Sequence, residues 1–249
     1  PAGRWLLERL PASARAGGAG GASAARPPAR CAARPLVLPR RRTACYSAFM
    51  QSGRLLYAAA DMGVIERGLT WKRAAGALPR LGPEDLLVLE ANLAPSLVGR
   101  LIRSRAGGAR LVFESVSVEK LLRHQMHLHD LYLLSANREE LAALRSRLAA
   151  GRPRGGVGWL RAFLQDRRIE HLLVPQGPRG ARLYRLDARG RLESNRASPS
   201  RVVRAPDTTG AGDLLLARVI AALACGRGPA RALSEAVRRV QRALQRGKL

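Results

Sequence analysis

Between residues 85 and 177, short apolar runs alternate with amphipathic segments, and this alternation restricts the fold more than any other feature. Four runs have the length of buried strands, and each lies next to polar residues: 85–93, 109–115, 130–137 and 169–177. Segments with helical spacing of apolar residues separate them, at 95–108, 138–150 and 157–167. Such a chain builds βαβ units with parallel strands in one sheet. We therefore predict an α/β fold, a three-layer α/β/α arrangement around a mostly parallel central sheet.

Two further patterns flank this core. "CYSAFM" and "RLLYAAADM" are strand-like and are joined by the turn-like Gln51-Ser52-Gly53, so we predict a β-hairpin there. A second hairpin is predicted at 181–197, with its turn at Ala188–Gly190. The segments from Asp213 onward and from 230 to 245 are predicted to be helices.

Residues 1–42 differ from the rest in composition. They are rich in Ala, Gly, Pro and Arg and contain one acidic residue, so they cannot bury enough apolar surface to fold alone. Their Arg-rich, acid-poor composition is typical of an organelle transit peptide, but a flexible tail or a wrongly assigned gene start fits equally well. We predict a low-complexity segment at 1–42 and a folded domain at 43–249.

The net charge of +26 raises the alternative of a nucleic-acid-binding protein. We disfavour it, because only Lys72, Lys120 and Lys248 among the 44 basic residues are lysines and the arginines are spread along the chain. The three cysteines form no disulfide or metal-binding pattern, which favours a reducing compartment such as the cytoplasm, or an organelle if 1–42 is a transit segment. No apolar run is long enough to cross a membrane, so we expect no membrane partner.

The stretch "DTTGAGD" (207–213) precedes an apolar helix. Gly210 and Gly212 lack Cβ atoms where backbone and an anion must come close, and the helix that follows offers unpaired amides to that anion. Asp213 at the helix start is suited to take a proton from a hydroxyl that attacks a phosphorus atom. The alternative is that Asp207 and Asp213 only cap the helix, which the order of the seven residues and their setting disfavour.

This stretch resembles the C-terminal signature of the ribokinase-like (PfkB) carbohydrate and nucleoside kinases. "SANREEL" (135–141) and "PQGPRG" (175–180) follow the order and spacing of two further motifs of that family, although Pro175 replaces a Thr. The resemblance implies a ribokinase-like fold and ATP-dependent phosphorylation of a nucleoside or sugar hydroxyl. It implies the following site: Asp213 as the base; Gly210, Ala211 and Gly212 as the anion hole; Asn137 and Glu140 at Mg²⁺, through water; Gln176, Gly177, Gly180 and Thr208 at ATP; Asp207 and Thr209 at a monovalent cation such as K⁺.

Three segments in the first half, "ADM" (60–62), "EANL" (90–93) and "FESVSVEK" (113–120), are similar to pseudouridine kinases, with Ser115 in place of the usual Pro. This resemblance implies pseudouridine as the substrate. Its contacts would come from Asp61, Asn92, Glu114 and Lys120. The alternatives are that Asn92 and Glu114 cap helices and that Lys120 is solvated.

Two departures from the family pattern bear on activity. No counterpart of the family's N-terminal sugar-binding region is found, and Arg238, Arg239 and Arg242 replace small residues of the last helix. We therefore expect a truncated kinase domain with an incomplete N-terminal part. An inactive ribokinase-like remnant stays an alternative, and a homodimer stays open. His124, His127 and His129 lie close in sequence, but we expect core or surface histidines and no metal site there.

Overall fold

The computed structural model describes residue 38 and residues 40–51, 54–78, 81–104, 108–148, 156–203, 205 and 208–247. They form two compact units. One contains the described parts of Pro1–Phe49 and Leu55–Leu78, and the other contains those of Met50–Arg54 and Pro79–Leu249. Most of the segment predicted to be of low complexity, 1–42, therefore lies outside the described residues.

The first unit is built on the predicted hairpin. β1 (Cys45–Gln51) and β2 (Arg54–Asp61) form a two-stranded sheet, followed by α3 (Gly63–Glu66) and α4 (Trp71–Ala77). The Asp61 carboxylate accepts a hydrogen bond from the Gly63 amide at 3.1 Å, which fixes the turn between β2 and α3.

The second unit contains a six-stranded sheet in the order β3-β4-β5-β6-β7-β8. The strands are β3 (Leu86–Glu90), β4 (Arg110–Glu114), β5 (Leu133–Ser135), β6 (His171–Pro175), β7 (Ala181–Leu186) and β8 (Leu192–Ala197). β3 to β6 are parallel, and β7 and β8 continue the sheet antiparallel. Glu90, Glu114 and Ser135 are successive partners in register, so three polar residues meet at the carboxyl edge.

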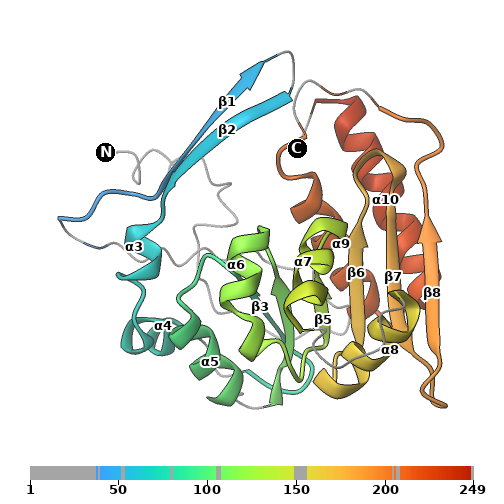
Figure 1. The fold of residues 1–249 in the computed structure, drawn as a ribbon, viewed down its shortest axis with the longest axis horizontal. Coiled ribbons are helices and arrows are strands. Elements are labelled where there is room, and N and C mark those ends of the chain that lie inside the picture. The colour runs from blue at the N-terminus through green and yellow to red at the C-terminus, as the bar shows by residue number, and fades with distance from the viewer. Residues whose placement is uncertain are drawn as a thin grey trace, which may run out of the picture. The chain divides into compact units, whose positions relative to one another are not determined.

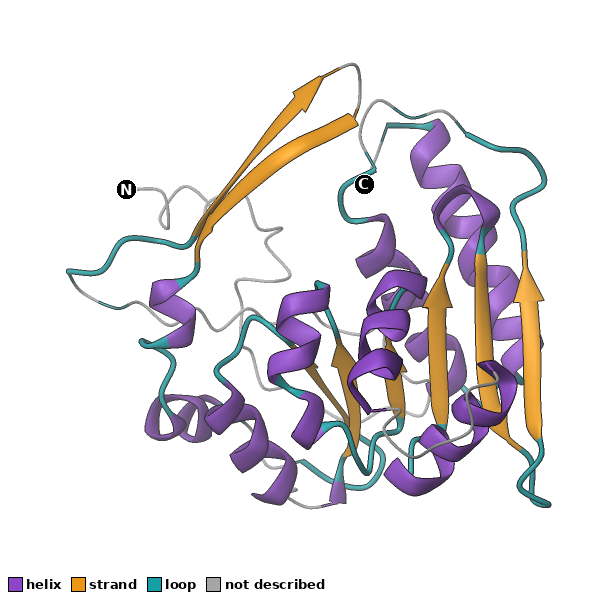
Figure 2. Ribbon diagram, in the orientation of Figure 1, coloured by secondary structure: helices purple, strands orange, loops and turns teal. Residues whose placement is uncertain are grey.

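Helices cover both faces of this sheet (Figures 1 and 2). Because β3 to β6 follow one another in a single direction, right-handed crossovers place their connecting helices on the same face. These helices are α5 (Pro95–Ser104), α6 (Val118–Arg123), the 3₁₀ turn η2 (Gln125–His127), α7 (Arg138–Leu148) and α8 (Gly156–Arg167). α9 (Ala211–Ala224) and α10 (Pro229–Gln245) pack on the opposite face, against β6, β7 and β8.

The core between the sheet and α9 and α10 is aliphatic. Leu133, Leu173 and Leu183 point from successive strands toward Val219 of α9 and Leu233 of α10, and all five are fully buried. Alternation along the strands sends their neighbours, such as Leu134 and Leu172, toward α5–α8. Both faces of the sheet are therefore buried, which explains why the parallel strands are continuous apolar runs in the sequence.

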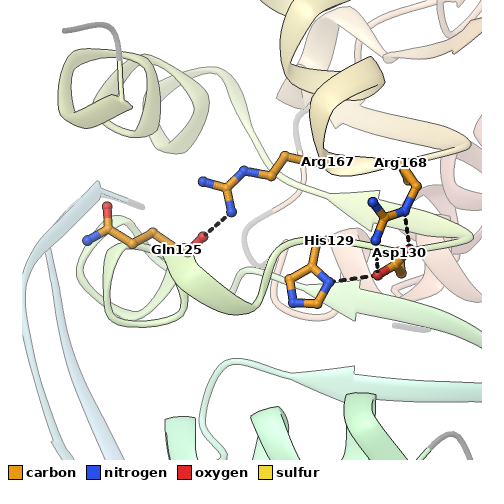
Figure 3. Close-up of polar contacts among 5 residues, drawn as sticks. All are labelled: Gln125, His129, Asp130, Arg167 and Arg168. Atoms are coloured by element: carbon orange, nitrogen blue, oxygen red, sulfur yellow. Dashed lines mark hydrogen bonds and ion pairs between the residues drawn. The ribbon is translucent and has the colours of Figure 1, made fainter.

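The amino ends of β5 and β6 are joined by a charged cluster (Figure 3). Arg168 donates two hydrogen bonds to the Asp130 carboxylate, at 2.5 and 2.7 Å, and His129 contacts the same carboxylate at 2.8 Å. Arg167 donates to the Gln125 carbonyl at 3.2 Å. This cluster lies at the edge of the sheet opposite to the carboxyl ends of the parallel strands, so it belongs to the support of the sheet and not to the site described below.

The second predicted hairpin is confirmed as β7 and β8. Asp187 accepts hydrogen bonds from the amides of Arg189 and Arg191, and Gly190 has a φ of 69°, as a tight turn requires. The prediction at 130–137 was too long, because only Leu133–Ser135 is a strand. The helices α3, α4 and α6 were not predicted. Among the described residues, no helix is long and apolar enough to span a membrane.

Candidate active site

The first turn of α9 is formed by the Gly-Ala-Gly sequence. Gly210, the residue before the helix, has a φ of 83° and a ψ of −4°, a left-handed conformation that favours glycine. The Leu214 amide donates to the Gly210 carbonyl at 2.9 Å, so the amides of Gly212 and Asp213 belong to the first turn, which has no acceptor within the helix itself. A Cβ added at Gly212 would stand in open space. The turn therefore presents first-turn amides and the positive end of the helix dipole to a space that an anion can enter.

Asp213 lies in that first turn and is exposed to solvent. Its charge, together with that of Glu140, acts on the Glu114 carboxyl at the end of β4 and raises its pKa. The start of α9, the end of β4 and the start of α7 therefore meet at the carboxyl edge of the sheet.

Asn137 and Glu140 begin α7 as a capping box. The Asn137 side-chain oxygen accepts hydrogen bonds from the amides of Glu139 and Glu140, at 2.9 and 3.0 Å, and the Glu140 carboxylate accepts one from the Asn137 amide at 2.7 Å. The Ser115 hydroxyl donates to the same Glu140 oxygen at 2.5 Å. Glu140 is 4% exposed, so these contacts fix its carboxylate against the end of β4.

Glu114 is a half-buried carboxyl group in the same cluster. Burial is the largest cause that raises its pKa to about 7, the charges of Glu140 and Asp213 raise it further, and a hydrogen bond from Ser135 acts in the opposite direction. Its Oε2 atom is buried and has no hydrogen-bond partner in the described part of the chain. Ser117 caps α6, so the helix-capping alternative for Glu114 is wrong.

These groups fit a hard cation. Glu114 has an unpartnered carboxylate oxygen, and Glu140 and Asp213 lie close enough to act on its charge. Oxygen ligands of this kind suit Mg²⁺, which keeps several waters in protein sites. Among the described residues no group of three or more His, Cys, Asp or Glu is spaced for direct ligation, so such an ion would be held largely through water.

An apolar cavity of about 550 Å³ adjoins the start of α9. Its wall includes Gly177 and Gly180 from the loop after β6, and Thr208, Ala211 and Gly212 from the predicted phosphate loop. The structure therefore brings together two motifs that are about thirty residues apart in the chain. The other described residues of the wall come from the segment after β8, from α9 and α10, and from the region of β6 and the loop after it: Pro199, Val202, Val203, Ala205, Leu215, Val237, Val240, Gln241, Leu244, Pro175 and Pro178.

Two of the predicted nucleotide-loop and cation residues, Gln176 and Thr209, are not among the described residues of that wall. Gln176 is half-buried, and its amide donates to the Gly180 carbonyl at 2.8 Å, so it closes the loop. Thr209 is exposed beside the loop. Asp207 lies outside the described residues.

The proposed substrate residues divide between the two units. Asn92 follows β3, and its side-chain oxygen accepts a hydrogen bond from the Lys120 ammonium on α6. Lys120 is half-buried and paired, so the solvated alternative is wrong for it. Asp61 belongs to the first unit, where it caps the turn before α3.

The sequence analysis missed the walls of the cavity that α10 and residues 199–205 supply. The spacing of Val237, Val240 and Leu244 is an amphipathic signal that predicts a buried face, but it does not tell a core from a cavity wall. The contact of Ser115 with Glu140 was also missed, although Ser115 was singled out as a departure from its pattern. His124 is fully buried, with Nε2 at 3.2 Å from the Ala91 carbonyl, as expected for a core histidine.

Comparisons with known proteins agree with this geometry. The model of the pfkB family carbohydrate kinases matches residues 80–243. A ribokinase from Thermotoga maritima has a similar fold, with a TM-score of 0.57 and 16% identity over 77% of this chain and 58% of that chain. A carbohydrate kinase from Agrobacterium tumefaciens gives a TM-score of 0.62 and 24% identity, over 85% of this chain and 65% of that one. A nucleoside kinase from Methanocaldococcus jannaschii gives 0.52 and 17%, over 70% and 54%.

At these identities the solved structures establish the fold, and the chain spans less than two thirds of the length of each. None of the curated proteins is significantly similar in sequence. The family model, however, covers well over half of the chain and includes the ends of β3, β4 and β5, the loop after β6 and the start of α9. The chain belongs to the pfkB family of carbohydrate kinases.

Proposed function

We propose that the protein transfers the γ-phosphoryl group of ATP to a hydroxyl of a sugar or nucleoside. The observation that carries this proposal is the first turn of α9, where the exposed Asp213 carboxylate stands beside the amides of the helix start at the edge of an apolar cavity. Such a site holds the three parts that phosphoryl transfer needs: a base, donors for the phosphoryl charge and a place for the nucleotide.

In this proposal Asp213 accepts the proton of the acceptor hydroxyl. The hydroxyl oxygen forms a bond to the γ-phosphorus, and the bond from that phosphorus to the oxygen that bridges to the β-phosphate breaks, leaving ADP. The amides of Gly212 and Asp213 donate to the phosphoryl oxygens during the transfer, with Gly210 and Ala211 shaping the turn.

Asn137, Glu140 and Glu114 would hold a Mg²⁺ ion, mostly through water. When bound, the ion neutralises phosphate charge that the site otherwise has to offset. Glu140 is fixed by Ser115 and by the Asn137 amide, so it supplies a charge of defined position. Asp207 and Thr209 are proposed to bind a monovalent cation; a dependence of the rate on K⁺ over Na⁺ would support this.

The apolar cavity is proposed to receive the nucleotide, with its phosphates at the start of α9. Gly177, Gly180 and Thr208 lie in its wall, and Gln176 closes the loop that carries the two glycines. Its volume of about 550 Å³ lies in the range of pockets for molecules of this size.

Pseudouridine is proposed as the acceptor. The support is the resemblance of residues 60–62, 90–93 and 113–120 to pseudouridine kinases, together with the Asn92–Lys120 pair beside the carboxyl ends of β3 and β4. Amide and ammonium donors suit the carbonyl oxygens of a uracil ring. Glu114 would be a further contact. A phosphorylation screen with pseudouridine, uridine, adenosine, ribose and fructose tests this; a clear preference for another acceptor would exclude pseudouridine.

The test of the kinase proposal is Asp213→Asn. Loss of the base should lower the rate of transfer by about 10²- to 10⁴-fold, because that is the usual contribution of a general base. Nucleotide affinity, measured by calorimetry, should change by less than about threefold, since the amides that bind phosphate remain. Asp166→Asn on the exposed side of α8 is the matched control. Unchanged turnover in Asp213→Asn would remove Asp213 from the base role.

We also propose that residues 43–249 act as the kinase domain and residues 1–42 lie outside it. Two copies are proposed to associate through the β1–β2 hairpin, whose apolar side chains are exposed.

A further inference from the structure

The wall of the nucleotide cavity carries few groups that could recognise a base. Among the described residues that line it, only Thr208 and Gln241 have polar side chains, and none is charged. Thr208 belongs to the loop at the start of α9, where the phosphates are proposed to bind. Three wall residues, Pro175, Pro178 and Pro199, lack a backbone N–H, so they cannot donate from the main chain either.

The Gln241 side chain is hydrogen-bonded to Ser200 within the protein. Its side-chain oxygen accepts hydrogen bonds from the Ser200 amide at 3.1 Å and from the Ser200 hydroxyl at 3.3 Å. Its amide nitrogen donates to the Ser200 hydroxyl at 2.9 Å. Gln241 is 8% exposed, so this pair ties the segment after β8 to the inner face of α10 at the cavity wall.

We propose that the cavity binds ATP and GTP with little discrimination, and that the Gln241–Ser200 pair positions the wall that both bases contact. The proposal rests on the proposed function of this cavity and adds its nucleotide preference. Gln241 and Ser200 are positioning residues here, because they act through the wall formed by Pro199, Val202 and Val203.

The chemistry of the two bases supports this. Adenine and guanine share the N7 acceptor and differ at position 6, where adenine has an amino donor and guanine a carbonyl acceptor. To prefer adenine by a side chain, the site needs an acceptor for the amino group, and the Gln241 oxygen already accepts two hydrogen bonds from Ser200. The second N–H of the Gln241 side chain can donate to a base, but its acceptor N7 is present in both adenine and guanine. A hydrogen bond to N7 would therefore not distinguish the two bases. The aliphatic wall therefore contributes apolar contact that does not depend on the group at position 6.

The first experiment measures displacement of a fluorescent ATP analogue from the full chain by ATP and by GTP in the presence of Mg²⁺. We expect dissociation constants within about tenfold of each other, because apolar pockets discriminate weakly while sites that hydrogen-bond a group discriminate by about 10⁴ or more. A preference above about a hundredfold for either nucleotide overturns this inference and leaves the proposed kinase function standing. Absence of binding by both nucleotides overturns the two together.

The second experiment separates positioning from direct recognition. Ser200 is the exposed partner of the pair, and Ser200→Ala removes both hydrogen bonds of its hydroxyl with Gln241. This variant should raise the dissociation constants of ATP and GTP by the same factor, about three- to tenfold. Ser200→Thr keeps the hydroxyl and should restore both. Gln165→Leu, exposed on α8, is the control and should change neither.

Gln241→Leu tests the same contact from α10, with its melting temperature measured in parallel because the residue is buried. It should weaken ATP and GTP equally and raise KM for the nucleotide without changing kcat. A loss for ATP with GTP unchanged would mean that Gln241 contacts adenine directly, which overturns the inference. Unchanged affinity for both nucleotides in Ser200→Ala and Gln241→Leu would overturn the positioning role.

Discussion

Gly210 and Gly212 are two residues apart in one turn, but they are glycines for different reasons. Gly210 has a φ of 83°, which a side chain at that position would strain. Gly212 is helical and a Cβ there would meet no atom within 4 Å, so the protein itself does not require glycine. Gly212 lines the cavity, so the open space beside it belongs to the cavity. We infer that the glycine keeps this space open for a ligand.

This difference gives a paired prediction. Gly210→Ala should lower the free energy of unfolding by about 1 kcal/mol, because a left-handed conformation costs an L-residue about 1–2 kcal/mol. Gly212→Ala should raise the free energy of unfolding by up to about 1 kcal/mol, since Ala has a higher helix propensity than Gly. The same variant should weaken nucleotide binding, because the added methyl group enters the cavity. Urea denaturation and calorimetry measure the two effects. A Gly212→Ala variant that binds nucleotide normally would show that the space does not serve a phosphate.

Glu114 predicts a dependence of stability on pH. Its pKa rises from an ordinary 4.5 to about 7 in the folded protein, mainly through burial. Between these values the unfolded chain releases the proton and the folded protein keeps it, so the free energy of unfolding falls as pH rises from 4.5 to 7 and stays low above it. The full effect is about 3 kcal/mol.

The measurement is urea denaturation at pH 5 and pH 8 in the presence of a chelator. Glu114→Gln should be close to the wild type at pH 5 and more stable than it at pH 8, because the neutral amide avoids the buried charge. Glu119→Gln, exposed on α6, is the control and should follow the wild type at both values. If the wild type and Glu114→Gln differed in free energy of unfolding by the same amount at pH 5 and pH 8, the raised pKa would not belong to Glu114.

At the scale of elements, α7 depends on its capping box. Asn137→Ala should destabilise the protein by about 1 kcal/mol, because the amides of Glu139 and Glu140 lose their acceptor. Asn137→Asp keeps an acceptor at the same place and should retain most of the stability. Thermal melting of both variants decides this; equal losses would show that the cap contributes little.

The helices and strands were largely predictable because their signals are local. The apolar runs at β3, β4 and β6, the acidic first turn of α7 and the Asp187–Gly190 turn depend on neighbours within a few residues. β5 was predicted too long, because Leu131 and Tyr132 continue the apolar run of the strand but lie in the loop fixed by Asp130 and Arg168. That contact joins residues 38 positions apart, so no local pattern encodes it.

At the scale of the whole molecule, the β1–β2 hairpin predicts an assembly. A two-stranded sheet is marginal by itself, yet its side chains Tyr46, Phe49 and Tyr57 are 60%, 48% and 58% exposed. Phe49 and Tyr57 stack with their ring centroids 4.1 Å apart, which forms a flat apolar surface. A second copy of the same hairpin would cover such a surface.

Sedimentation velocity should therefore show a dimer for the wild type and a monomer for the double variant Phe49→Ser, Tyr57→Ser. Met126→Ser, another exposed apolar residue that lies outside the hairpin, is the control and should stay dimeric. A monomeric wild type at micromolar concentration would exclude this assembly.

The sequence alone determined the order of the strands, most of the longer helices and the family, because periodicity and short motifs report on neighbours in the chain. Only the tertiary structure decided which residues meet. The parallel register joins Glu90, Glu114 and Ser135, and the packing of α10 under the loop after β6 makes the cavity wall. The pKa of Glu114 and the commitment of Gln241 to Ser200 depend on that packing, since burial and long-range contacts arise only when distant segments come together.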